Sequence, residues 1–110
     1  MDIEKQKLNL LCDAAQLLLE NGSETYRVEE TAQRMAKGLN IEHVNIAALP
    51  TTVFLEADGR ACVRRISRRG TNSQRIAMVN EISRRIERGE MTPDMARAEL
   101  ERARRMPGFS

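Results

Sequence analysis

Apolar and polar residues follow two different periods along this chain, and the change of period divides it into helices and strands. In residues 3–20 the polar side chains recur at spacings of three and four, at Gln6, Asn9, Asp13, Gln16 and Glu20. They form one narrow stripe on an otherwise apolar helix, so we expect this helix to be buried around most of its circumference. Asn21-Gly22 is predicted to end it, because glycine readily adopts the left-handed conformation that closes a helix.

A second helix is predicted from Ser23, a suitable N-cap, to Lys37. One face of this helix is apolar and contains Val28, Ala32, Met35, Ala36 and Leu39. Glu30 and Arg34 are spaced to pair at i, i+4 on the opposite face.

The period falls to two in residues 44–66, which predicts strands. A first alternating run ends at Pro50, and residues 51–57 are rich in the β-branched side chains that favour a second strand. Asp58-Gly59 separates the second run from a third, residues 60–66. Because Asp-Gly suits a two-residue turn with positive φ at both positions, we predict a three-stranded antiparallel meander.

Two further helices complete the pattern. Asn72 or Ser73 can cap a third helix that runs to about residue 88. Thr92-Pro93 supplies the N-cap and first residue of a fourth helix, which is predicted to reach Met106. The order ααβββαα predicts an α+β fold, a single domain over residues 1–110 with the helices packed on one face of the sheet.

Composition narrows the expected chemistry. The chain has 110 residues and only 3% aromatic residues, so one modest core must be built from aliphatic side chains and methionine. Cys12 and Cys62 lie in apolar stretches without a C-x-x-C motif or a Cys/His cluster. We therefore expect both to be reduced core residues of a cytoplasmic protein, with no metal or cofactor. The longest apolar run, residues 8–19, is shorter than a membrane span, so the chain is expected to be soluble.

Charge is distributed unevenly along the chain. Residues 1–58 hold 5 basic and 10 acidic side chains, whereas residues 59–110 hold 13 basic and 6 acidic ones. The second half includes four Arg-Arg pairs, at positions 64–65, 68–69, 84–85 and 104–105. This asymmetry suggests a surface for an anionic ligand, a polyanion or an anionic membrane, although solvated helix faces would have the same composition.

Three stretches of the chain together resemble the N-terminal cytoplasmic region of the threonine/serine exporter family, which also includes paired dicarboxylate-exporter subunits. The first, residues 20–30, reads ENGSETYRVEE and joins the first two helices. The second, residues 48–53, reads ALPTTV and enters the second strand. The third, residues 65–72, reads RISRRGTN and continues as VNEISR in residues 79–84.

The resemblance implies that a bundle of membrane helices follows this soluble domain and carries the transport pathway. It implies a location at the cytoplasmic face of the inner membrane and contact with the chain's own transmembrane domain or a partner membrane subunit. It also implies a homo- or hetero-oligomer in the full protein. Arg97, Arg102, Arg104 and Arg105 would then be juxtamembrane charges within reach of anionic lipid headgroups. The implied role is gating, substrate sensing or assembly in the export of small amino acids or dicarboxylates, without catalysis.

One cluster of candidate substrate-binding residues lies in the first turns of the second helix: Glu24, Thr25, Arg27, Glu29 and Glu30. Carboxylates here suit the positive end of the helix dipole and can hold the ammonium group of an amino acid. Helix capping and pairing of Arg27 with Glu30 at i, i+3 explain the same residues without a ligand.

A second cluster precedes the third helix: Arg68, Arg69, Gly70, Thr71 and Asn72. Two guanidinium groups and exposed N–H groups at a helix N-terminus suit a carboxylate or phosphate, although a strand-to-helix turn capped by Asn72 would look the same. Combined, the two clusters predict one site that senses an amino acid or a dicarboxylate.

Two other function classes receive less support. A basic nucleic-acid- or anion-binding module is the alternative, because the Arg pairs supply phosphate contacts. Phe54 is the only aromatic residue in the predicted strands, however, and stacking of bases on a sheet requires more. An enzyme is not expected, since His43 is the only histidine and no nucleophile-elbow glycines surround Ser67.

Overall fold

The computed structural model describes residues 3–107 and contains seven elements in the predicted order. They are α1 (Ile3–Glu20), α2 (Thr25–Gly38), β1 (Asn45–Leu49), β2 (Thr52–Ala57), β3 (Arg60–Arg65), α3 (Ser73–Glu87) and α4 (Pro93–Arg105). The α+β class and the order ααβββαα are therefore confirmed.

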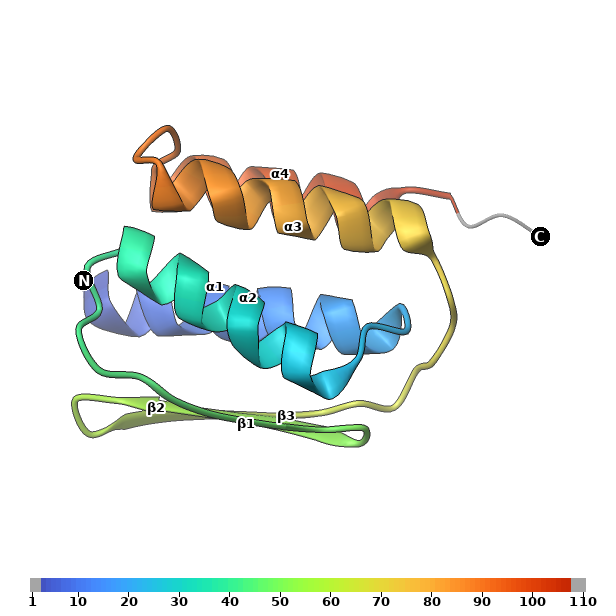
Figure 1. Cartoon of the computed structure of the whole chain (residues 1–110), viewed down its shortest axis with the longest axis horizontal. Coiled ribbons are helices and arrows are strands. Elements are labelled where there is room, and N and C mark those ends of the chain that lie inside the picture. The colour runs from blue at the N-terminus through green and yellow to red at the C-terminus, as the bar shows by residue number, and fades with distance from the viewer. Residues whose placement is uncertain (1–2, 108–110) are drawn as a thin grey trace.

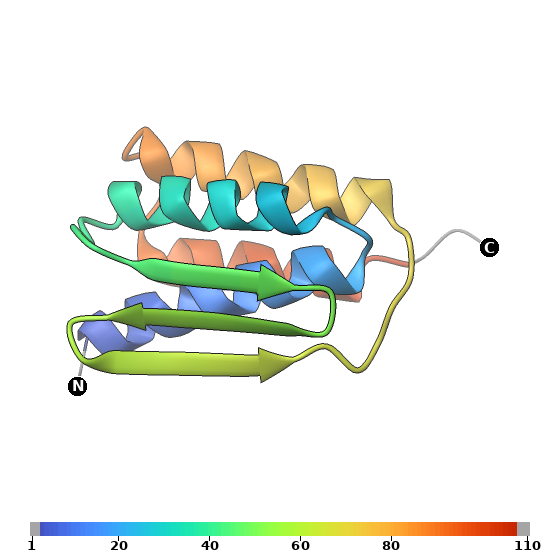
Figure 2. The ribbon, with the colours of Figure 1, turned by 60° about the horizontal axis from the view of Figure 1, so that its bottom comes forward.

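The elements form three layers (Figure 1). The sheet is one outer layer, α1 and α2 lie against one of its faces, and α3 and α4 pack on the far side of these two helices. The prediction that the helices lie on one side of the sheet is confirmed (Figure 2). Only α1 and α2 cover the sheet directly, whereas α3 and α4 pack on these two helices and complete their burial.

The sheet is the predicted meander, with strand order β1-β2-β3 and both pairs antiparallel. Asp58 and Gly59 have φ values of 52° and 78°, which is the two-residue turn expected from the Asp-Gly dipeptide. Burial alternates along β2, where Val53, Leu55 and Ala57 face the helices. The intervening residues of each strand point away from the helices, so one face of the sheet remains open.

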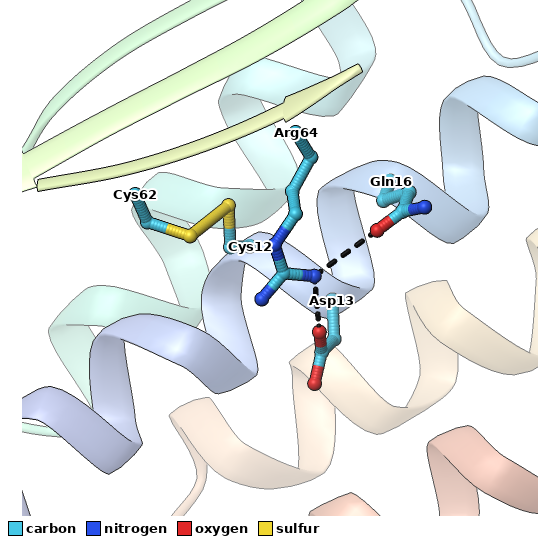
Figure 3. Close-up of a disulfide and its surroundings, with 5 residues drawn as sticks. All are labelled: Cys12, Asp13, Gln16, Cys62 and Arg64. Carbon is cyan, nitrogen blue, oxygen red and sulfur yellow. Dashed lines mark hydrogen bonds and ion pairs between the residues drawn. A yellow bond between two sulfur atoms is a disulfide. The ribbon is translucent and has the colours of Figure 1, made fainter. Parts of the chain in front are cut away.

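Helix α1 is buried on most of its circumference, as predicted. Its polar stripe lies beside β3, where Arg64 donates from Nη1 to Asp13 Oδ1 at 2.5 Å and to Gln16 Oε1 at 3.0 Å (Figure 3). The half-buried Arg64–Asp13 pair therefore orients α1 against the edge of the sheet.

The two cysteines are joined as a disulfide, so the expectation that both are reduced is wrong (Figure 3). Cys12 of α1 and Cys62 of β3 have Cα atoms 6.6 Å apart, within the range that a disulfide spans. Both residues belong to the core, with exposed fractions of 0% and 8%. The bond links the helix layer to the sheet across 50 residues of sequence.

Some local predictions about α2 are wrong. The helix begins at Thr25 with Glu24 at the N-cap and without a side-chain cap, so Ser23 does not cap it. Arg34 donates to Ser83 Oγ of α3 at 3.1 Å rather than pairing with Glu30. Arg34 thus connects α2 to the neighbouring helix layer. In the part of the chain that the structure describes, no helix combines the length and apolarity needed to cross a membrane.

Helices α2 and α3 lie very close together at Gly38. A Cβ atom at this position would lie 2.4 Å from the backbone oxygen of Ile86 and 2.8 Å from Glu87 Cα. Because the obstructing atoms belong to the backbone of α3, no side-chain rotation can relieve the overlap.

Removing the disulfide is expected to lower the free energy of unfolding by about 2–4 kcal/mol, because the bond restricts the unfolded chain. Urea unfolding with and without a reducing agent measures this difference. The double variant Cys12→Ala and Cys62→Ala serves as control, since a reducing agent should not change its stability further. Detection of two free thiols in the unreduced, unfolded wild-type chain would contradict the pairing.

Gly38→Ala is expected to destabilise the fold by about 1–3 kcal/mol through overpacking. The sign is informative, because glycine-to-alanine changes inside helices usually stabilise by about 0.5–1 kcal/mol. Lys37→Ala on the exposed neighbouring position is the matched control and should leave the thermal midpoint nearly unchanged. A higher midpoint for Gly38→Ala would show that the two helices are not this close.

Candidate ligand-binding site

Three loops meet at one end of the molecule, at the right of Figure 2. They are residues 21–24 between α1 and α2, residues 50–51 between β1 and β2, and residues 66–72 between β3 and α3. Each of these loops lies within one of the three stretches that carry the family resemblance. We call this meeting point the loop junction.

Backbone hydrogen bonds hold the loop junction together. The Gly70 N–H donates to the Glu20 carbonyl at 2.9 Å, and the Asn72 N–H donates to the Asn21 carbonyl at 3.1 Å. Gly22 has φ of +97°, and a Cβ atom there would approach the Gly70 carbonyl oxygen to 3.2 Å. The first and third loops therefore run side by side, and glycine permits the close approach.

Two buried asparagines position the helix ends around the loop junction. Asn21, 5% exposed, donates from Nδ2 to the Leu17 carbonyl at 2.8 Å and accepts at Oδ1 from Arg75 Nη1. Asn72, 6% exposed, accepts at Oδ1 from the Arg75 N–H at 3.0 Å, so it is the N-cap of α3, one of the two predicted caps. Arg75 also donates to the Met106 carbonyl, which ties the end of α4 to the same region.

A cleft of about 390 Å³ opens at the loop junction. Its lining combines apolar, hydroxyl and charged residues: Leu19, Gly22, Ser23, Glu24, Thr25, Pro50, Arg69 and Gly70. We call it the junction cleft. Its volume is near the lower end of the range for small-molecule sites.

The charged groups of the junction cleft come from different loops. Arg69 donates from Nη2 to the Pro50 carbonyl at 2.6 Å, which holds its guanidinium at the cleft. Guanidinium has five N–H donors, so others are left for a carboxylate of a ligand. Glu24, the exposed residue directly before α2, also belongs to the lining. The cleft thus offers one cationic and one anionic group to the same small volume.

The other acidic residues of the first predicted cluster lie elsewhere. Glu29 accepts at Oε2 from the Ala48 N–H at 3.0 Å, so it connects α2 to β1. Glu29 and Glu30 line a separate open cleft of about 1090 Å³ beside α2. Arg27 donates to Tyr26 Oη and lies over its ring rather than pairing with Glu30, and this hydrogen bond raises the pKa of Arg27.

The second predicted cluster is divided as well. Arg68 lines a smaller pocket of about 240 Å³ next to the junction cleft, together with Arg75 and Arg104. Arg69 and Gly70 line both, whereas Thr71 is exposed and Asn72 serves the helix cap. The structure therefore brings together Glu24, Thr25, Arg69 and Gly70 of the ten predicted site residues in the junction cleft.

Several uncharged residues of the cleft lining were not predicted from the sequence. Ser23 was assigned to capping, and Leu19 and Pro50 were not assigned to a site. A signal was present in the sequence, because Ser23 and Pro50 lie within the stretches that carry the family resemblance. Their position between elements, rather than within them, favours a role at a loop-lined surface.

A comparison with known families agrees with these stretches. The family model described as "Putative threonine/serine exporter" matches residues 9–110. The chain belongs to the threonine/serine exporter family. This is a transporter family, and the role of the chain is related to amino acid export. No curated protein and no solved structure matched the chain.

The arginines of α4 are paired within their own helix. Arg97 binds Asp94 at 3.1 Å and Arg102 binds Glu99 at 2.9 Å. Arg105 binds Glu101 at 3.1 Å, and Arg104 lies 3.8 Å from the same residue. Within residues 3–107, no group of three His, Cys, Asp or Glu residues is placed to hold a metal ion. The charged residues of the loop junction are therefore the stronger candidates for an exporter-related ligand.

Asn72→Ala is expected to lower the free energy of unfolding by about 0.5–2 kcal/mol, because the α3 N-terminus loses its cap. Asn72→Ser is the control, since serine restores a cap acceptor and should recover most of the loss. Urea unfolding followed by circular dichroism measures both. Equal losses for the alanine and serine variants would show that Asn72 acts through something other than capping.

Proposed function

We propose that this chain is the cytoplasmic domain of a membrane exporter of threonine and serine or of dicarboxylates, and that its junction cleft senses the substrate before export. The observation that supports this proposal most directly is the convergence of the family-defining stretches on one small, charged cleft. A gating role follows if ligand binding alters the loops, since the third loop connects the sheet to α3 and is hydrogen-bonded to the end of α1.

The lining of the cleft matches the groups of a hydroxy amino acid. Arg69 would bind the α-carboxylate, and the Glu24 carboxylate would bind the α-ammonium group. The hydroxyl groups of Ser23 and Thr25 would bond the side-chain hydroxyl of the ligand. Leu19 and Pro50 supply apolar surface for its carbon atoms. A dicarboxylate would use Arg69 together with Arg68 of the neighbouring pocket and would not need Glu24.

The placement relative to the membrane rests on charge and on the loop junction. The carbonyl of Met106, one residue before the last described residue, accepts a hydrogen bond from Arg75 beside this junction, so a following membrane segment would start close to the junction cleft. Arginines near that segment favour the cytoplasmic side. In this arrangement the partner of the domain is its own transmembrane region or a partner membrane subunit, and the exposed Arg68 lies within reach of anionic headgroups.

The disulfide must be reconciled with this placement, because disulfides are rare in reducing compartments. Both cysteines are almost fully buried. Reduction by exchange requires that a thiolate reach a sulfur atom, and burial hinders this attack. The cytoplasmic placement therefore requires that the Cys12–Cys62 bond be protected by the fold once formed.

Titration of the domain with L-threonine, L-serine and succinate, followed by amide NMR shifts, tests the sensing role. We expect shifts at residues of the loop junction. The expected Kd is in the millimolar range, as suits an open cleft, and corresponds to a binding free energy of about −4 kcal/mol. Arg69→Ala should weaken every ligand, whereas Glu24→Gln should weaken the amino acids and spare succinate.

Arg97→Ala is the matched control, because this arginine lies on α4 and pairs only with Asp94 in the described part of the chain. It should leave all three titrations unchanged. Absence of shifts at the loop junction up to about 50 mM ligand, well above the expected Kd, would contradict the sensing role. Such a result would leave assembly with the membrane region as the function of the domain.

A further inference from the structure

The open face of the sheet carries an apolar centre. The helices all lie on the opposite side in the described part of the chain, as Figure 1 shows. Leu49, Phe54 and Val63 point away from the helices, and their side chains are 59%, 40% and 60% exposed. These are three of the six large hydrophobic side chains that the described residues expose. Exposed apolar groups that gather on one surface favour an interaction site.

The strand register arranges this face in three rows. The middle row is Ala47, Phe54 and Val63, which lie side by side on the three strands. One outer row is Asn45, Glu56 and Ala61, and the other is Leu49, Thr52 and Arg65. The apolar middle row is therefore flanked by a carboxylate on one side and a guanidinium on the other.

Glu56 and Arg65 do not neutralise each other within one chain. Their rows are four residues apart, which is about 13 Å along the strands. Glu56 accepts hydrogen bonds from Asn45 Nδ2 at 2.8 Å and from the Gly59 N–H at 3.1 Å, and these bonds lower the pKa of its carboxyl group. Neither Glu56 nor Arg65 belongs to an ion pair within residues 3–107.

We propose that the open face of the sheet binds a second copy of this chain in a two-fold dimer. A two-fold axis along the middle row places Phe54 against its symmetry mate and reverses the strand direction of the partner. The outer rows then exchange places, so each Glu56 lies next to Arg65 of the other copy. The dimer therefore contains two Glu56–Arg65 pairs, one at each end of the shared apolar centre.

Self-complementarity distinguishes a second copy from other occupants. A two-fold interface uses the same patch on both subunits, so it must contain groups that complement one another after rotation. The Glu56 and Arg65 arrangement meets this condition. Aligned packing of two sheets is also a common arrangement, with the interdigitated side chains filling about 10 Å between them.

The expected dimer is weak. Each strand contributes only five or six residues, so the face is smaller than the roughly 800 Å² that each partner contributes to a standard interface. We therefore expect a dissociation constant on the order of 100 μM. The interface does not include Glu24 or Arg69, so this dimer does not depend on ligand binding at the junction cleft.

Sedimentation equilibrium of the chain between about 10 μM and 1 mM, a range that brackets the expected dissociation constant, tests the proposal. Wild type should shift from monomer to dimer across this range. Phe54→Asp should remain monomeric, and Val63→Lys provides a second disruption should the first variant unfold. Met95→Asp is the control, because it places a charge on an apolar side chain of α4 that is 46% exposed and outside the face.

A charge exchange tests the two-fold geometry. Glu56→Arg and Arg65→Glu alone should each weaken the dimer about tenfold, since like charges then meet across the interface. The double variant restores opposite charges and should return to within about threefold of wild type. A wild-type monomer at 1 mM would overturn the proposal. So would a double variant as weak as the single ones, or a dimer unaffected by Phe54→Asp and Val63→Lys.

Discussion

The burial of α1 between the sheet and the second helix layer is the constraint on which the rest of the structure depends. This helix contacts α2, α3, α4, β2 and β3. Its apolar circumference can be satisfied only if elements pack on nearly every side of it, so the remaining chain must provide two layers. The polar stripe marks the one side where water or a charged partner is tolerated, and there Arg64 meets Asp13. The loop junction follows because α1 ends where the β3–α3 connection crosses between the layers.

The element order was predictable because period, turn chemistry and caps agree locally. Asp58-Gly59 and Thr92-Pro93 are unambiguous for this reason, and both predictions are confirmed. The disulfide was not predictable in the same way. Alternation places Cys62 on the inner face of its strand, but a helix that is apolar on most sides does not show which side faces β3. Only the packed structure brings Cys12 to Cys62.

The candidate site was also only partly predictable from the sequence. Glu24 and Glu29 are five residues apart, a separation that rotates side chains by about 140° around a helix. The predicted cluster nevertheless combined both residues, and the structure places Glu29 at the Ala48 N–H instead. Arg69 and Glu24 are 45 residues apart in sequence, and the backbone hydrogen bonds from Gly70 to Glu20 and from Asn72 to Asn21 bring their loops together. Local sequence patterns indicate which residues are candidates for the site, whereas tertiary packing determines which of them lie together.

Pairing, rather than composition, decides where charge is available on this molecule. The basic second half of the sequence suggested a surface for an anionic partner, but the α4 arginines are neutralised by carboxylates one turn away. Arg64 is likewise paired with Asp13 in a half-buried position. Exposed ion pairs contribute little to stability, yet they reduce the field that a polyanion would meet. Arg68 beside the junction cleft, and Arg65 with Glu56 on the open face of the sheet, are among the charged residues that belong to no ion pair within residues 3–107. Because the rows of the open face include neither Glu24 nor Arg69, ligand binding and self-association do not compete for the same groups.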